Sequence, residues 1–167
     1  MSSNKPVPCV GCGVMFREHG GPTHRYMESS PGCWAAFGEV LAREYSDPAY
    51  GLLHRLTVDA YAAQHPGRQS PQAIQSVAGH LISLSLVLER GVDMRRATSA
   101  IRTAASRKNF FPWLSPPSSR GDTTVADVLR ASDAEEHLAA VDAWAKAVWL
   151  AWSAHHDTVR LWVSEVL

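Results

Sequence analysis

The chain has 167 residues, 46% of them hydrophobic, and its 16 basic residues balance its 16 acidic ones. This length and composition fit one domain with a substantial hydrophobic core and exclude a largely disordered chain. The zero net charge argues against nucleic acid or an anionic membrane as the main partner, which leaves a small molecule or another protein.

The N-terminal residues MSSNKPVPC contain no apolar run of signal-peptide length. We also find no apolar stretch of roughly 20 residues that would cross a membrane. The three cysteines are an odd number, which argues against a disulfide framework. We therefore expect a cytoplasmic protein that uses its cysteines as thiols or as metal ligands.

Residues 1–32 are rich in Gly, Pro, Ser and Cys and show neither helical nor strand periodicity. We expect an irregular, zinc-knuckle-like segment here, packed on a helical bundle domain formed by residues 33–167. No strand is expected in either part, so the predicted fold class is all-α.

The remaining chain shows helical spacing of apolar residues, with start and stop signals between the segments. Pro31 and Pro71 are suited to first turns, and Ser132 to Glu135 form a capping box. The aromatic stretch 109–122 is expected to pack over the helices, because its rings would otherwise lie in water. Four main helices should form the bundle, and helices are expected at residues 31–46, 48–64, 71–89, 94–107, 124–130 and 134–166.

The stretch CVGCG places Cys9 and Cys12 in one tight turn, the spacing that supplies two ligands to a tetrahedral Zn²⁺. Two further ligands are needed. Cys33 lies in the first turn of the first predicted helix, where the helix dipole favours a thiolate. His24 is preferred to His19 as the fourth ligand because it lies nearer to Cys33 and away from Gly20 and Gly21. A structural zinc site would explain how a segment without a core becomes ordered.

Other interpretations of the cysteines stay open at this point. The Cys-x-x-Cys pair is also typical of thiol and disulfide exchange, although no strand and helix unit follows it here. The cysteines are alternatively ordinary thiols, with His24 a loop residue, or Cys33 is a nucleophile at a helix N-terminus.

Two predicted helices carry histidines on apolar stripes. His80 shares a stripe with Val77 and Leu84, and the last helix places His156 or its neighbour His155 facing inward. A buried imidazole needs a metal, a carboxylate or another polar partner.

Asp59, at the edge of the apolar arc of the second helix, is the expected partner of these histidines. We expect a pocket between the helices that serves as a metal-dependent catalytic site for hydrolysis or group transfer, with a second divalent metal. Its predicted residues are Asp59, Tyr61, His65, His80 and His156. The alternative is a hydrogen-bonded polar core in a non-catalytic interaction or sensor module that has only the structural zinc.

Several blocks of the chain, among them CVGCG, DAYAAQHPG, IQSVAGHL and WAKAVWLAWSAHH, carry a family resemblance. They resemble a bacterial family, common in actinobacteria, whose domain has no assigned function. The resemblance covers nearly the whole chain and implies no activity.

Overall fold

The computed structural model describes residues 5–106 and 111–167, and helices dominate the fold. The N-terminal segment contains a small hairpin, in which β1 (Pro6–Pro8) pairs antiparallel with β2 (Met15–Arg17). The prediction that the chain has no strand was therefore wrong. Strands of three residues are too short to show an alternating pattern in the sequence.

The first three long helices follow the sequence signals closely. α1 (Pro31–Ser46) and α3 (Pro71–Leu88) each begin with a proline, and each is capped by the preceding serine. α2 (His54–Gln64) begins later than predicted, because a 3₁₀ turn, η1 (Gly51–Leu53), comes before it.

The helices of the second half are α4 (Met94–Ser106), α5 (Val125–Leu129), α6 (Ala134–Ala151) and α7 (His156–Val166). The prediction of one continuous helix over 134–166 was wrong, because the chain leaves helical geometry at Trp152 and passes through the turn η2 (Ser153–His155). The buried Trp152 indole donates a hydrogen bond to Ala63 O at 3.0 Å. This contact holds the break against α2 and lets α7 pack on α3.

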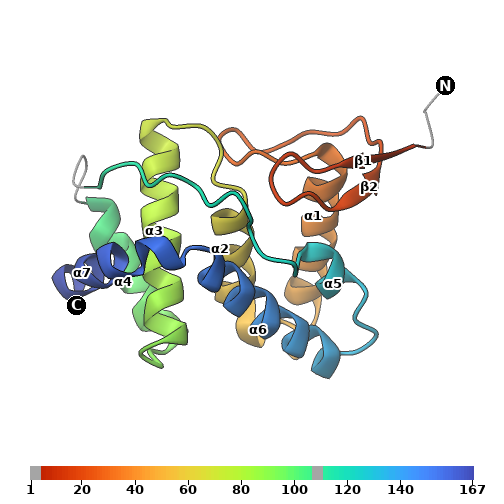
Figure 1. Ribbon diagram of the computed structural model, residues 1–167. Helices are drawn as coiled ribbons and strands as arrows, with labels where there is room; N and C mark the ends of the chain where they lie inside the picture. Colours follow the sequence, from red (N-terminus) through yellow and green to blue (C-terminus); the bar gives the residue numbers. More distant parts are fainter. Residues whose placement is uncertain (1–4, 107–110) are drawn as a thin grey trace.

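The main helices form a bundle, as the sequence predicted. In Figure 1, α1, α2 and α3 stand side by side, α6 crosses in front of α2, and α4 and α7 lie beyond α3. The hairpin lies beside the N-terminal end of α1. Large fully buried side chains join these helices, namely Tyr61, Leu81, Leu84, Trp144 and Trp152.

The segment 111–124 closes over the bundle, as its aromatic residues predicted. Phe111 is buried and meets the ring of Trp162 edge to face, and Leu114 is buried as well. Phe110, which was included in that prediction, lies outside the described residues.

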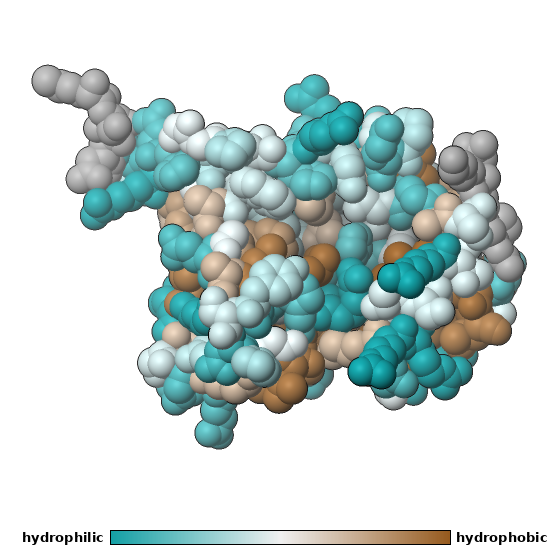
Figure 2. Space-filling view, turned by 180° about the vertical axis from the view of Figure 1, so that it is seen from behind, coloured by the Kyte–Doolittle hydropathy of each residue, from teal (hydrophilic) through white to brown (hydrophobic). Residues whose placement is uncertain are grey.

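α3 is long and apolar enough, by length and composition, to span a membrane, and 56% of that segment is buried against the rest of the protein. The core helix of a water-exposed bundle meets the same criteria. Seen from the side opposite to Figure 1, the surface is mainly hydrophilic, and its hydrophobic side chains lie in separate groups (Figure 2).

Candidate metal centre

The hairpin loop presents the first two cysteines. The loop is closed by backbone hydrogen bonds from Cys9 N to Val14 O and from Gly13 N to Cys9 O, both 2.9 Å long. Gly13 has a φ of +77°, a conformation that glycine adopts without strain. The Cys9 sulfur accepts N–H groups from Gly11 at 3.4 Å and Ser30 at 3.3 Å. These N–H groups stabilise negative charge on that sulfur.

Three separate elements bring four ligand atoms together at one end of the bundle. Cys9 and Cys12 come from the hairpin loop, Cys33 from the first turn of α1 and His65 from the residue that follows α2. One ligand atom from each of these residues lies within 4.8 Å of all the others. We refer to these four residues as the Cys3His cluster. It is the only such group of three or more His, Cys, Asp or Glu side chains in the described part of the chain.

Hydrogen bonding fixes which nitrogen of His65 faces the sulfurs. His65 Nδ1 lies 2.7 Å from Tyr61 O, and a carbonyl oxygen only accepts, so Nδ1 carries the proton. His65 Nε2 is then unprotonated and lies 3.5 Å from Cys33 Sγ. A carbonyl that holds the second nitrogen in this way is the usual support of a metal-binding histidine.

Tyr61 forms the inner wall of the cluster. Its ring stacks on Phe37 and on His65, with centroid distances of 3.9 and 4.0 Å, and its hydroxyl donates to Cys33 Sγ at 3.5 Å. Burial and the charge of Cys33 raise the pKa of Tyr61 above its ordinary value. Tyr61 therefore acts as a neutral hydrogen-bond donor to the sulfur.

The three thiols do not share negative charge evenly. Hydrogen bonds from Cys12 and Cys33 lower the pKa of Cys9, whereas hydrogen bonds with Cys12 and Cys9, together with burial, raise the pKa of Cys33. Three thiolates so close together repel one another, and a bound cation removes that repulsion.

Arg120 brings positive charge and two hydrogen bonds to this region. Its Nη1 donates to Gly11 O at 2.9 Å, inside the Cys-x-x-Cys turn, and to Gln64 O at 3.4 Å. The side chain thereby links the hairpin loop, the end of α2 and the segment 111–124. Arg120 was not predicted, because it is 87 residues from Cys33 and belongs to no recognisable motif.

His24, which was the expected fourth ligand, lies outside the Cys3His cluster. Its Nδ1 accepts backbone N–H groups from Tyr26 and Met27, each at 3.3 Å. It therefore orders the turn that follows it. His19 likewise accepts a local bond, from Gly21 N at 3.1 Å.

The five residues predicted to line one catalytic pocket lie in three places. Tyr61 and His65 belong to the region of the Cys3His cluster. His156 stacks on Trp149, with ring centroids 3.8 Å apart, and its Nε2 lies 2.7 Å from Trp149 O. Asp59 and His80 meet at the third place, with Asp59 Oδ1 2.7 Å from His80 Nδ1.

The Asp59 carboxylate has further donors around it. Arg55 Nη2 donates to Oδ1 at 2.6 Å, and Ser83 Oγ donates to Oδ2 at 2.5 Å. Asp59 is fully buried, so these partners offset the loss of its hydration.

A second buried polar network was missed in the sequence. Glu44 accepts a hydrogen bond from Thr57 at 2.7 Å and lies 2.8 Å from a ring nitrogen of both His54 and His137. Glu44 follows Arg43 in a polar stretch of α1, where a carboxylate is expected to face solvent.

The protein is a helical bundle that carries the Cys3His cluster at one end. A family model matches residues 7–153, and the chain belongs to that family, a family of unknown function (DUF5946). The match confirms the prediction that the chain belongs to a family without an assigned function. The bacterial range of that family and its diagnostic motifs stay predictions. Neither a curated protein nor a solved structure matches the chain.

Proposed function

We propose that the protein binds one Zn²⁺ through Cys9, Cys12, Cys33 and His65, and that this ion has a structural role. The convergence of the four ligand atoms within 4.8 Å carries the proposal. Three sulfurs and one imidazole nitrogen are a ligand set typical of structural zinc.

The distances agree with a tetrahedron around zinc. Bond lengths of about 2.3 Å to sulfur and about 2.0–2.1 Å to nitrogen imply about 3.8 Å between two sulfurs and about 3.6 Å between sulfur and nitrogen. Cys12 Sγ and Cys33 Sγ are 3.9 Å apart, and Cys33 Sγ is 3.5 Å from His65 Nε2. These two pairs already have the separation that a tetrahedral site needs, and the remaining pairs lie within 4.8 Å.

A structural role is favoured over a catalytic one. Four protein ligands complete the tetrahedron and leave no position for water or substrate. Three of the four, Cys9, Cys33 and His65, are also buried. The ion would join the hairpin to α1 and α2. Within residues 5–17, Cys9 is the one buried member of the hydrophobic core.

A second, catalytic metal at Asp59 and His80 has less support. Arg55 and Ser83 already engage both oxygens of the carboxylate, and Arg55 places a cation where a metal ion would bind. Within the described residues, no third ligand side chain joins this pair. Of the two functions inferred from the sequence, the non-catalytic module with structural zinc is the one we propose. Its three cysteines form no disulfide, which suits a reducing compartment such as the cytoplasm.

The experiment is metal analysis of four purified proteins: the wild type, C33S, H65A and H24A. We expect one zinc per chain in the wild type and in H24A, and a loss of zinc in C33S and H65A. X-ray absorption of the wild type should give three sulfurs and one nitrogen around the ion. Retention of zinc in H65A together with its loss in H24A would contradict the proposed ligand set.

A further inference from the structure

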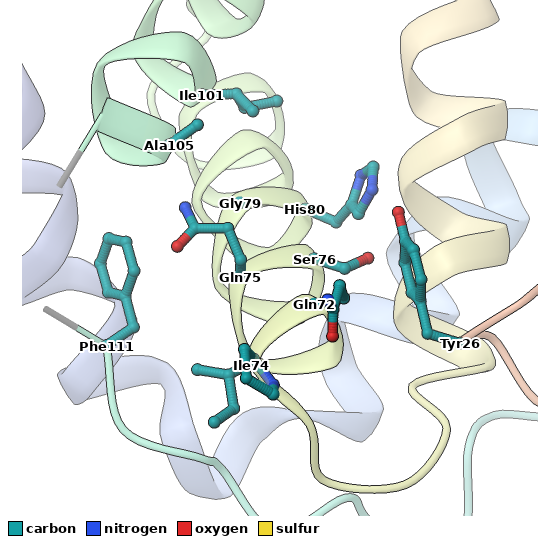
Figure 3. Close-up of a pocket in the computed structure, with 11 residues that line it drawn as sticks. Tyr26, Gln72, Ile74, Gln75, Ser76, Gly79, His80, Ile101, Ala105 and Phe111 are labelled. Atoms are coloured by element: carbon teal, nitrogen blue, oxygen red, sulfur yellow. The ribbon is translucent and has the colours of Figure 1, made fainter. Parts of the chain in front are cut away.

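A pocket of about 660 Å³ lies along α3, apart from the Cys3His cluster. Figure 3 shows it in front of α3, with Tyr26 on one side and Phe111 and Ala105 on the other. No Lys, Arg, Asp or Glu is among the described residues that line it. This pocket is large enough for a small organic molecule.

His80 gives the pocket an oriented hydrogen-bond acceptor. His80 Nδ1 donates to Asp59 Oδ1 at 2.7 Å and therefore carries the ring proton. His80 Nε2 has no hydrogen-bond partner among the described residues, and the side chain remains 19% exposed at the pocket wall. Because Asp59 is fully buried and is held by Arg55 and Ser83, the ring has a fixed direction.

Gln75 gives the pocket a donor that has no partner within the described part of the chain. Its Nε2 is buried and makes no hydrogen bond there, which is unfavourable for an amide group. The residue lies five positions before His80 on α3 and lines the same pocket. Figure 3 shows Gln75 on the side of α3 that faces Phe111, whereas His80 lies on the side that faces Tyr26.

Gly79 leaves the helix surface open between these two side chains. A Cβ at this position would meet only Ile101 Cγ2, at 3.4 Å, which is an ordinary contact. Packing of α3 on α4 therefore tolerates alanine here. Glycine is nevertheless unfavourable inside a helix. Its presence keeps the pocket open beside an apolar wall of Ile101 and Phe111.

We propose that this pocket binds a small uncharged molecule that combines a hydrogen-bond donor, a hydrogen-bond acceptor and an apolar body. The donor binds His80 Nε2, the acceptor receives the Gln75 amide, and the apolar body covers Ile101 and Phe111. An ionised ligand is excluded, because it would lose hydration without meeting an opposite charge. The inference goes beyond the zinc site and does not depend on it.

Hexanamide is the simplest probe of this class, and hexanoate is its charged counterpart. We expect titration of the ¹⁵N-labelled protein with hexanamide to give saturable shifts at the His80 ring nitrogens and at the Gly79 and Ile101 amides. Hexanoate should bind at least about tenfold more weakly, the ratio that one lost hydrogen bond produces. Shifts that do not saturate, or equal binding of both probes, would overturn the proposal.

Two variants locate the binding site. G79L fills the pocket and should abolish the shifts, while G38L should leave them unchanged. Gly38 is the control because it is a glycine of α1 at which an added Cβ would have no atom within 4 Å. Q75L removes the unpaired amide, so it should raise the melting temperature and weaken hexanamide binding about tenfold. If G79L does not fold, the hexanamide affinity of Q75L tests the proposal instead. Binding by Q75L at wild-type strength overturns the proposal.

Discussion

Gly11 lies directly against the ring of His65: a Cβ at Gly11 would stand 2.3 Å from His65 Cδ2 and 2.5 Å from Glu28 O. Because Gly11 has no side chain, the Cys-x-x-Cys turn leaves room for the His65 ring beside the sulfurs. We expect G11A to displace His65 and to destabilise the zinc-loaded protein by about 1–3 kcal/mol, as overpacking does. Zinc release to a coloured chelator and thermal unfolding measure the effect.

The control for G11A is G20A, because a Cβ added at Gly20 would have no atom within 4 Å. G20A should release zinc at the wild-type rate. Equal behaviour of the two variants would mean that His65 does not need the space at Gly11.

Arg120 holds the same turn from the other side, through Gly11 O and Gln64 O. We expect R120M to weaken zinc binding and to lower stability by about 1–3 kcal/mol, because the carbonyls of Gly11 and Gln64 lose their donor and the thiolates lose a nearby cation. Chelator competition at equal ionic strength is the measurement. R68M is the matched control, since the Arg68 side chain is 92% exposed and pairs with Glu28 at the surface.

The hydroxyl of Tyr61 donates to Cys33 Sγ, whereas its ring packs independently of that bond. Y61F should therefore keep its zinc and lose about 0.5–1.5 kcal/mol of unfolding free energy. Denaturant titration gives that value. In Y45F, which alters an exposed tyrosine bonded to His54, the free energy should stay within about 0.5 kcal/mol of the wild type. Complete loss of zinc from Y61F would assign the hydroxyl a larger role than this geometry gives it.

Glu44 is the common acceptor for Thr57, His54 and His137. Its replacement in E44A leaves those donors unpaired, so we expect a destabilisation of about 2–4 kcal/mol, measured by chemical unfolding. E39A changes an exposed glutamate of the same helix and should have little effect. Similar stabilities of the two variants would show that water replaces the carboxylate.

Glu89 joins the end of α3 to α7 through Arg160, whose Nη2 donates to Oε1 at 2.7 Å. The hydrogen bond from Arg160 lowers the pKa of Glu89 in the folded protein. The unfolded chain therefore binds the proton more readily, and the contribution of Glu89 to stability is present above the ordinary glutamate pKa of about 4.3 and is lost below it. E89Q should lower the melting temperature at about pH 7 and lose this effect at about pH 3. An equal decrease at both values would contradict the ion pair.

Three of the four cluster residues were predictable from the sequence, because Cys9 and Cys12 share one turn and Cys33 follows the first helix cap. The fourth was not. Proximity along the chain favoured His24, whereas the close approach at Gly11 and the end of α2 bring in His65 from 32 residues beyond Cys33. A signal was present in the sequence His-Pro-Gly, where a helix must end and a side chain can turn away from its axis.

Helix positions were predictable for similar reasons, since caps and prolines act locally, as at Ser30 and Ser70. The break at Trp152 was not, because it depends on a hydrogen bond to Ala63, which is 89 residues away. The apolar stripe of α6 continues into α7, so the sequence pattern predicts one uninterrupted helix. The pairing of Asp59 with His80 was predictable because His80 lies on an apolar stripe and Asp59 lies at the edge of another. The partners of Glu44 were not predictable, because they come from two other helices, α2 and α6.

The four residues of the Cys3His cluster all lie between positions 9 and 65 of the chain. During synthesis, every ligand is therefore available once residue 65 has left the ribosome, before α3 to α7 have emerged from it. The longest loop between successive ligands runs from Cys33 to His65, and most of it is formed by α1 and α2. Short, largely helical connections of this kind close quickly. If the proposed zinc site forms, a nascent chain can assemble it first and use it as the fixed end against which the later helices pack.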